Sequence, residues 1–392
     1  MKGPARLKLK RPIERAISSG HPWVYGEALE PARGLAAGAE VELLTRNARP
    51  LARGLYDPSS PLALRVYTLD PREAIDAAFV KRRLARALSI RRPAFDASTN
   101  AFRWCNGEGD LLPGVVVDLY DRVAILRIDG AAARVLVPFI IAALPAVAAE
   151  AGITLSHGYE RSRGGVGAVL FGGAPPEEVP IVEHGVRFLV DVLRGQKTGF
   201  FLDQRENRRR VRAIAAKKRV ANLFSYTGGF SVSAALGGAK HVTSVDVAPA
   251  AIAAARTHFT ANGLDAAAHE FSATDAFEWL KSARDAGTRY DLIVTDPPSF
   301  APSEHALPAA IAAYRELNAA AMGLLPDGGT LCAASCSSHV DMEAFLGSLA
   351  EAARAVRRPL SVQEAHGQPL DHPSPAGFPE GRYLKFVICR VG

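Results

Sequence analysis

The chain has 392 residues, which is long enough for two or three domains with hydrophobic cores of their own. Hydrophobic residues make up 48% and charged residues 22%, as in an ordinary soluble globular protein, and the formal net charge is +7. The four cysteines form no CxxC pair, which argues against a zinc site and a disulfide framework. No apolar signal core or run of membrane-spanning length is recognised, so we expect a cytoplasmic protein with reduced thiols and neither a membrane nor a metal partner.

Residues 1–70 are expected to form a small, mostly β module. Two β-like runs, Ala39–Leu44 and Pro61–Tyr67, are separated by glycines and by the Asp57-Pro58 pair.

Residues 71–182 are expected to form a central α+β domain. Its predicted elements are a helix over Arg72–Ser89, strands over Gly114–Leu119 and Val123–Ile128, and a helix over Ala131–Ala151. The glycine- and proline-rich stretch 172–176 marks a linker or an exposed turn.

From residue 183 to 392 strands and helices alternate, which predicts a doubly wound parallel sheet of the α/β class. The helix over Ala248–Asn262 ends at an Asn-Gly pair, an expected C-terminal stop. The helix after Leu202 carries Asp203 and Glu206 at its start, a capping-box variant.

Four small polar motifs in this third region each end an apolar run. They are Val220–Ser231, Val242–Asp246, Ser272–Asp275 and Leu292–Ser299. Open α/β sheets bind ligands outside the carboxyl ends of their strands, so the motifs are expected at one edge. A glycine turn followed by acids after the second and third strands and by Asp-Pro-Pro after the fourth indicates a site for S-adenosylmethionine (SAM).

The roles of these residues follow from their chemistry. Gly228 and Gly229 allow close approach of the backbone to a ligand, and the turn lacks the GxGxxG spacing of dinucleotide-binding dehydrogenases. Asp246 is placed to accept from two ribose hydroxyls, and Asp275 from the adenine amino group. Asp296-Pro297-Pro298-Ser299 predicts a rigid ledge for a planar base, because proline fixes φ and donates no hydrogen bond.

The stretch Gly195–Arg205 has two interpretations. It could fold over the donor, with Lys197 near the donor carboxylate and Phe200 or Phe201 against an apolar face. It could equally be a loop that leads into a helix, with Phe201 and Leu202 in the core.

Cys336 ends a later apolar strand beside the predicted site. Carbon 5 of a pyrimidine is a poor nucleophile, and a thiolate that adds to carbon 6 makes carbon 5 able to take a methyl group. Free cysteine is also among the most buried residue types, so a structural role is the alternative. We expect Cys332, Cys105 and Cys389 to be structural.

The positive charge is clustered. Residues 1–15 include Lys2, Arg6 and Lys10, and residues 205–219 are rich in arginine and lysine, each cluster with a single acid. Either cluster could be a solvated helix face, but two clusters in a chain with a methyl-donor site favour a polyanionic substrate.

With these residues in place, the chain resembles the bacterial 23S ribosomal RNA cytosine-C5 methyltransferases over nearly its whole length. The resemblance is carried by Ser19–Tyr25 and Arg53–Pro58, which look like PUA motifs, by Cys105–Gly114, and by Gly195–Asn207, Asn222–Phe230, Asp296–Phe300 and Ser335–Ser337. It implies a PUA-like RNA-binding domain (1–70), a central domain (71–182) and a Rossmann-like class I SAM-dependent methyltransferase domain (183–392).

The resemblance also implies roles for individual residues. Cys336 would be the nucleophile, and Asp296 a base or a substrate-orienting group. SAM would be bound by Lys197, Thr198, Phe200, Gln204, Asn222, Phe224, Ser225, Tyr226, Thr227, Gly228, Gly229, Asp246, Asp275, Ala276, Asp296 and Pro297. The RNA substrate would be bound by Pro298, Ser299, Arg205, Arg208 and Arg209.

Three functions stay open. The chain could form 5-methylcytosine in 23S rRNA through a Cys336 adduct, in which case the base enters the site flipped out. It could instead methylate an exocyclic amine of an RNA purine, since Asp-Pro-Pro also serves that chemistry without a thiol. It could also be a non-catalytic SAM-binding RNA module. RNA is the expected partner in each case, and a homodimer is left open.

Overall fold

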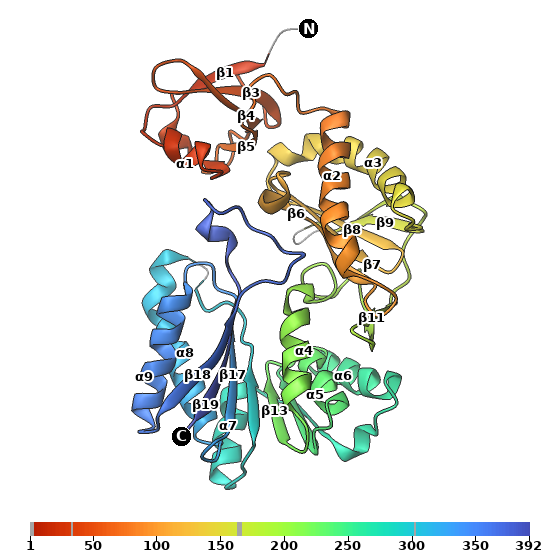
Figure 1. The fold of residues 1–392 in the computed structure, drawn as a ribbon, viewed down its shortest axis with the longest axis vertical. Coiled ribbons are helices and arrows are strands. Elements are labelled where there is room, and N and C mark those ends of the chain that lie inside the picture. The colour runs from red at the N-terminus through yellow and green to blue at the C-terminus, as the bar shows by residue number, and fades with distance from the viewer. Residues whose placement is uncertain (1–3, 33, 163–166, 302) are drawn as a thin grey trace. The chain divides into compact units, whose positions relative to one another are not determined.

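The computed structural model describes residues 4–32, 34–162, 167–301 and 303–392 (Figure 1), so Lys2 of the first basic cluster lies outside the described residues. It contains two compact units. The first consists of Met1–Val182, Leu189–Leu202 and Leu370–Gly381, and the second of Glu183–Phe188, Asp203–Pro369 and Arg382–Gly392.

The first unit begins with a five-stranded sheet of order β1-β3-β4-β5-β2. Its strands are β1 (Ala5–Lys8), β2 (Trp23–Val24), β3 (Ala39–Leu44), β4 (Pro50–Tyr56) and β5 (Leu64–Thr68), accompanied by α1 (Glu14–Ser18) and the 3₁₀ turn η1 (Gly26–Ala28). The predicted strand Ala39–Leu44 is confirmed. The predicted strand Pro61–Tyr67 starts later, because the backbone N–H and the hydroxyl of Ser59 bond the Asp57 carboxylate and hold the preceding residues in a turn.

A second five-stranded sheet follows, with the order β10-β9-β8-β7-β6. Its strands are β6 (Ala101–Asn106), β7 (Val115–Tyr120), β8 (Val123–Ile128), β9 (His157–Glu160) and β10 (Ala168–Phe171). The helices are α2 (Ala77–Arg91), α3 (Val137–Glu150) and the 3₁₀ turns η2 (Arg92–Ala94), η3 (Gly107–Asp110) and η4 (Ala132–Leu136). Helix α2 starts five residues later than predicted, because the Asp76 carboxylate caps it by accepting from the Phe79 N–H at 2.8 Å.

The segment Ala132–Glu150, made of η4 and α3, is long and apolar enough to cross a membrane by length and composition alone. The expectation that no run approaches that length was therefore wrong. The same helix supplies Leu136, Ile140, Leu144 and Val147 to the hydrophobic core that it shares with α2 and the second sheet, which is the reason for its apolar composition.

The chain passes between the units at a two-stranded sheet of β11 (Val179–Glu183) and β12 (Val186–Val190). The second unit is built on a seven-stranded sheet of order β15-β14-β13-β16-β17-β19-β18. Its strands are β13 (Arg219–Leu223), β14 (His241–Asp246), β15 (Glu270–Ala273), β16 (Leu292–Thr295), β17 (Thr330–Ser335), β18 (Leu360–His366) and β19 (Lys385–Val391). The strands from β13 to β17 are parallel, and only β19 runs antiparallel to both of its neighbours.

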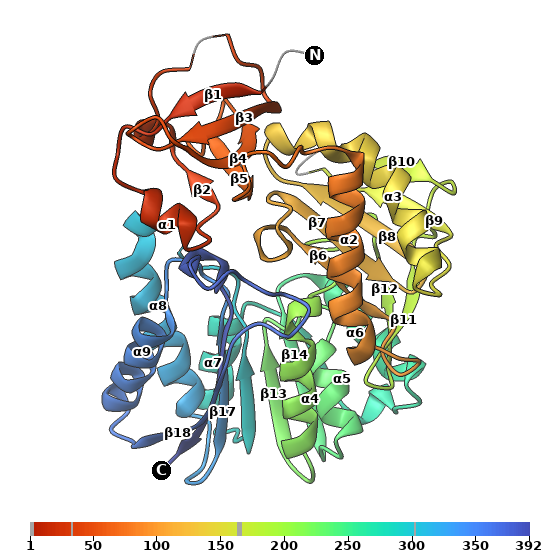
Figure 2. The same cartoon turned by 45° about the horizontal axis from the view of Figure 1, so that its top comes forward.

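The helices of the second unit are α4 (Arg205–Ile214), α5 (Gly229–Leu236), α6 (Pro249–Ala261), α7 (Ala276–Asp285), α8 (Leu307–Met322) and α9 (Met342–Ala355). The 3₁₀ turns along this part of the chain are η5 (Leu202–Gln204), η6 (Ala266–Ala268), η7 (Glu304–Ala306) and η8 (Pro379–Gly381), of which η8 belongs to the first unit. Helices α4, α5 and α6 pack together, and α7, α8 and α9 form a second group (Figures 1 and 2). The second group shares one hydrophobic core with the sheet. This is the predicted doubly wound α/β fold.

Helix α4 starts differently from the prediction. Gln204 is its N-cap residue and makes no side-chain cap, so the expected capping box with Asp203 and Glu206 does not form. Glu206 instead accepts from His184 at 3.0 Å and from Arg209 at 2.9 Å.

Candidate functional site

The carboxyl ends of the parallel strands meet at one edge of the seven-stranded sheet. In the strand register, Leu223 at the end of β13 stands opposite Val245 of β14 and Thr295 of β16. Chain order reverses at β13, since β14 and β15 lie on one side of it and β16 and β17 on the other. This reversal is the switch point at which open α/β sheets bind ligands.

The turn after β13 has a backbone that ordinary residues seldom adopt. Phe224, Tyr226 and Gly228 all have positive φ, at 58°, 47° and 77°. Two of these residues carry side chains, and such strain persists where the surrounding structure enforces it, commonly at ligand sites. The predicted glycine turn is therefore a rigid concave backbone between β13 and α5.

Three buried polar atoms of this turn have no hydrogen-bond partner among the described residues. They are Asn222 Oδ1, Ser225 Oγ and Thr227 Oγ1. The amide nitrogen of Asn222 is bonded to Ser231 Oγ at 2.9 Å, which fixes the orientation of the Asn222 side chain. Buried polar atoms are nearly always satisfied, so three orphans in one turn fit a polar ligand such as the amino acid part of SAM.

Asp246 lies at the end of β14 and is held by two backbone N–H groups. Its Oδ2 accepts from Tyr226 at 2.8 Å, and its Oδ1 accepts from Ala248 at 2.9 Å. A carboxylate has about four acceptor positions, so both oxygens retain capacity for ribose hydroxyls. The next residue, Val247, is 71% exposed.

Asp275 and Ala276 have structural roles that the sequence did not predict. Asp275 is the N-cap of α7, where its Oδ1 accepts from Phe277 and Glu278. Ala276 is buried in the core under α7. An adenine contact by Asp275 would have to use its second oxygen.

The predicted donor loop does not behave as one unit. Thr198 is buried in the first unit, with its hydroxyl bonded to Asp118 at 2.5 Å and to Tyr120 at 2.8 Å. Phe200 is also buried there, and its N–H donates to the Tyr120 hydroxyl at 3.2 Å. These contacts tie the loop to β7, and the assignment of Thr198 and Phe200 to SAM binding stays a prediction. Lys197 places its ammonium 4.6 Å from the centre of the Phe201 ring.

Gln204 belongs to the second unit, where its side chain is buried and contacts the Asp-Pro-Pro turn. Its Nε2 donates to Asp296 Oδ1 at 2.9 Å, and its Oε1 accepts from Asn207 at 2.6 Å. Gln204 is thus an orienting residue for Asp296, which follows β16. Of the turn that Asp296 begins, Pro297 is buried, whereas Pro298 and Ser299 are exposed and available to a substrate.

Cys336 follows β17 at the same edge as Asp246 and Asp296. Its sulfur lies 3.9 Å from the Pro297 carbonyl oxygen, so the thiol borders the Asp-Pro-Pro turn. Cys336 is half-buried, whereas Cys105, Cys332 and Cys389 are buried free thiols, as expected for structural cysteines. Burial raises the pKa of Cys105 and Cys332, and raises that of Cys389 to about 12. These three are therefore protonated and unreactive at neutral pH.

A polar cluster that sequence analysis missed supports the Cys336 turn. Ser337 Oγ lies 3.0 Å from Ser299 Oγ and 3.0 Å from the Tyr314 hydroxyl, and it accepts from the Ala301 N–H at 3.3 Å. Burial raises the pKa of Tyr314, so its phenol stays protonated. The cluster joins the turns after β16 and β17. Its only sequence signal was Ser337, directly after Cys336.

The arginines assigned to the substrate are mostly internal. Arg208 is buried and makes a bidentate pair with the buried Glu183 at 2.7 and 2.6 Å. Arg205 is buried too, with its Nε 3.3 Å from Glu206. Neither guanidinium is available to a phosphate, which corrects the assignment of these two. Arg209 is 57% exposed and is the one predicted arginine that a substrate could reach.

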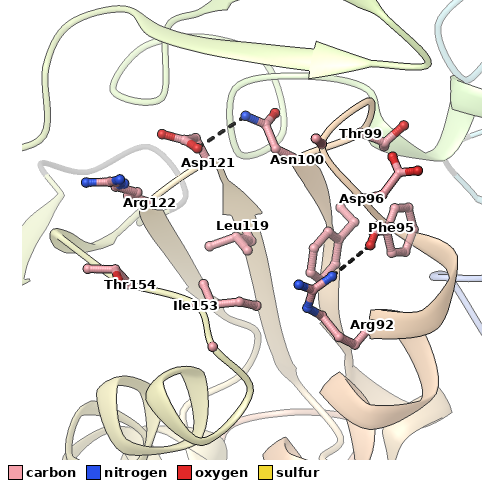
Figure 3. Close-up of a pocket in the computed structure, with 13 residues that line it drawn as sticks. Arg92, Phe95, Asp96, Thr99, Asn100, Leu119, Asp121, Arg122, Ile153 and Thr154 are labelled. Atoms are coloured by element: carbon pink, nitrogen blue, oxygen red, sulfur yellow. Dashed lines mark hydrogen bonds between the residues drawn. The ribbon is translucent and has the colours of Figure 1, made fainter.

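A surface cavity of about 320 Å³ in the first unit contains none of the predicted site residues (Figure 3). Its polar side chains already bond within the unit: Asn100 donates to Asp121 at 3.2 Å, and Arg92 to the Phe95 carbonyl at 2.8 Å. Within the part of the chain that the structure describes, no group of three or more His, Cys, Asp or Glu side chains is arranged to hold a metal ion.

Comparisons with known proteins show the family of the chain. Residues 110–374 match a family described as S-adenosylmethionine-dependent methyltransferase, and residues 7–69 match a PUA-like domain. The chain is 39% identical to a protein of Klebsiella pneumoniae named ribosomal RNA large subunit methyltransferase I, over 98% of each chain. It is 38% identical to the Escherichia coli protein of the same name, over 98% of this chain and 99% of that one.

Solved structures agree as well. A Streptococcus mutans protein described as SAM-dependent methyltransferase superposes with a TM-score of 0.88 at 27% identity, covering 99% of this chain and 100% of that one. A methyltransferase structure complexed with SAH superposes with a TM-score of 0.89 at the same identity and coverage. The predicted α/β fold, with a PUA-like domain and a Rossmann-like SAM-dependent methyltransferase domain, is confirmed.

Proposed function

The chain belongs to the SAM-dependent methyltransferase family of ribosomal RNA large subunit methyltransferase I, and we propose that it methylates carbon 5 of a cytosine in 23S rRNA. The observation that carries the proposal is the position of Cys336. Its half-buried thiol borders the Pro297 carbonyl at the sheet edge that also holds Asp246 and the strained turn after β13. The three functional requirements, a donor site, a base-binding ledge and a nucleophile, thus share one edge.

In the proposed reaction the Cys336 thiolate adds to carbon 6 of the flipped-out cytosine. The sulfur–C6 bond forms, and the electrons of the C5–C6 double bond become available at carbon 5. Bound SAM would supply an electrophilic methyl group to that carbon and would leave as S-adenosylhomocysteine. Loss of the C5 proton then restores the double bond as the sulfur–C6 bond breaks and the thiolate re-forms. Overall, the cytosine exchanges its C5 proton for a methyl group, SAM becomes S-adenosylhomocysteine, and one proton is released.

The side chains around Cys336 support this chemistry. Gln204 donates to Asp296 Oδ1 and so orients this carboxylate, which would accept a hydrogen bond from the amino group of the base. Pro298 and Ser299 are exposed beside it, where a planar base would stack on the ledge. The PUA-like domain and the exposed Arg209 would contribute phosphate contacts in the cytoplasm. We also propose that the chain is divided into three domains, residues 1–70, 71–182 and 183–392.

The test is the Cys336→Ala variant. We expect methylation of 23S rRNA to fall at least about a thousandfold, because the nucleophile is lost. SAM affinity should stay within about twofold, since Cys336 is not part of the turn after β13. RNA with 5-fluorocytosine at the target should form a covalent complex with the unmodified protein, visible on a denaturing gel, and none with the variant.

The matched control is Cys332→Ala, which removes a buried thiol from β17, the strand that precedes Cys336, and should leave methylation and adduct formation unchanged. Full methylation by Cys336→Ala, or a product methylated at an exocyclic nitrogen in mass spectrometry, would remove the carbon-5 mechanism and favour an N-methyltransferase. SAM and RNA binding without any methylation by the unmodified protein would favour a non-catalytic module.

A further inference from the structure

One buried cation of the second unit has no role in the reaction above. Lys385 is the first residue of β19, and its strand register places it opposite Ser335, the last residue of β17. The next residue of the chain after Ser335 is Cys336. Directly opposed residues of antiparallel strands project to the same face, so Lys385 enters the site beneath the nucleophile turn.

The ammonium of Lys385 is held by the backbone of that turn. Lys385 is 2% exposed. Its Nζ donates to the Ser337 carbonyl at 2.5 Å and to the Tyr383 carbonyl at 2.8 Å. The first bond fixes the residue that follows Cys336, and the second joins the lysine to the segment that precedes β19.

Lysine is seldom fully buried unless it is paired, because a charge loses its hydration there. Within the described part of the chain no carboxylate forms an ion pair with Lys385. Burial lowers the pKa of Lys385 to about 8, while the nearby groups Cys336 and Asp341 act in the opposite direction. The amine is therefore mostly an ammonium at neutral pH, and Cys336 is among the groups whose negative charge stabilises it.

Other titratable groups lie around this pair, including Tyr383, whose hydroxyl donates to Asp203. Asp341 caps the start of α9, Tyr314 of α8 bonds Ser337, and Asp296 precedes the carbonyl that the Cys336 sulfur contacts. Burial keeps the Tyr314 phenol protonated, because it raises the pKa of that group. The Lys385 ammonium is a cation among these groups, and a cation near a thiol favours the thiolate.

We propose that Lys385 is a positioning residue for Cys336: it pins the nucleophile turn through the Ser337 carbonyl, and its positive charge favours the reactive thiolate. The role in catalysis rests on the proposed function, in which Cys336 is the nucleophile. The coupling between Lys385 and Cys336 stands independently of which base is methylated.

The coupling can be measured without RNA. Iodoacetamide alkylates thiolates, and mass spectrometry of the Cys336 peptide gives the alkylation rate at each pH. In Lys385→Met we expect the midpoint of that pH profile to rise by about one unit or more. Methylation at pH 7 should fall about tenfold or more and recover partly at pH 9, with SAM affinity unchanged. Lys385→Arg, which keeps a cation, should retain a midpoint near that of the unmodified protein.

The matched control is Lys218→Met. Lys218 is also partly buried with its pKa lowered by burial, but it bonds Thr330 at the opposite end of β17. Its substitution should leave the alkylation profile of Cys336 unchanged. If Lys385→Met fails to fold, the alkylation midpoint is measured in Lys385→Gln instead. Glutamine keeps a hydrogen-bond donor for the Ser337 carbonyl and removes the positive charge of the lysine.

An unchanged alkylation midpoint in Lys385→Met, or in Lys385→Gln where the first does not fold, would overturn the proposal. If only the proposed function were wrong, Cys336→Ala would still methylate RNA, while the alkylation midpoint of Cys336 would still change on substitution of Lys385.

Discussion

At the scale of single residues, the turn after β13 combines three positive φ angles, three orphaned polar atoms and a close approach between two helices. The close approach of the two helices occurs at Gly228. A Cβ atom built on Gly228 would lie 2.7 Å from the Ala255 Cβ of α6, and its φ is 77°. The glycine is therefore required twice, once by the backbone conformation and once by the packing of α5 against α6.

We expect Gly228→Ala to lower the free energy of unfolding by about 2–3 kcal/mol, from left-handed strain plus the clash with Ala255. SAM affinity should fall at least tenfold, because the turn must move. Gly263→Ala is the control, since Gly263 has a φ of 71° and a Cβ atom added to it would meet no other atom within 4 Å, so only about 1 kcal/mol of strain is expected. Urea denaturation and calorimetric titration with SAM give the two quantities. An equal loss of unfolding free energy in Gly228→Ala and Gly263→Ala would show that the packing against Ala255 does not contribute to the cost.

At the scale of elements, helix α4 shows why a basic sequence is not a basic surface. Its buried side holds Arg208 against Glu183, and the opposite side presents Arg209 to solvent. Glu206 sits between His184, Arg205 and Arg209 and replaces the capping box that the sequence predicts. The cluster of basic residues was visible in the sequence, but the buried partner of Arg208 was not.

Glu206 predicts an acid-dependent stability. The hydrogen bond from His184, then the charges of His184 and Arg205, lower the pKa of Glu206 to about 2 from its usual 4.5. A lowered folded-state pKa means that the contribution is complete above about pH 4.5 and is lost as the pH falls towards 2. We expect Glu206→Gln to cost about 1–2 kcal/mol at pH 6, and the difference from the unmodified protein to shrink steadily below pH 4.5.

Urea unfolding between pH 6 and pH 3 measures this difference. Glu351→Gln on α9 is the control, because Glu351 pairs with Arg354 on the open surface and solvent screens that pair. A cost that does not vary with pH would mean that Glu206 acts through packing and not through its charge.

At the scale of the whole molecule, the net charge is +7, but the positive charge is less concentrated than the two basic clusters of the sequence suggested. Several side chains of the clusters form ion pairs. In the first basic cluster Arg6, Lys8 and Arg11 pair with Glu42, Glu30 and Glu27. In the second, α4 leads into the amino end of β13, so Lys217 and Arg219 lie at the edge opposite the candidate site. Arg209 is the fifth of the ten residues of α4, and its side chain is exposed.

RNA binding should distinguish these two ends of one cluster. We expect Arg209→Gln to weaken 23S rRNA binding and to reduce the slope of log affinity against log salt by about 0.7–0.9, the value for one phosphate contact. The double variant Lys217→Gln/Arg219→Gln should leave the slope unchanged. Filter binding over 50–200 mM salt measures both, and a larger effect of the double variant would place the RNA at the opposite edge of the sheet.

The sequence by itself determined the order of strands and helices in the methyltransferase domain and the placement of Asp246, Asp296 and Cys336 at strand ends. These features depend on local patterns: apolar runs, the polar residue that ends each run, and a turn with adjacent glycines. Since parallel strands align their carboxyl ends, three residues far apart in the chain could be assigned to one edge before the structure was known. Element boundaries were less accurate, as the starts of α2 and β5 show, because caps and turns depend on single hydrogen bonds.

Only the tertiary structure decided which polar side chains face the site and which face the interior. Thr198 bonds Asp118, Arg208 pairs with Glu183, and Lys385 holds the carbonyl of Ser337. Each of these pairs is separated by 25 to 80 positions in the chain, and no local pattern specifies such a partner. A buried polar group must find its partner wherever the fold places one, so its role depends on the packing of the whole chain and not on the residues beside it.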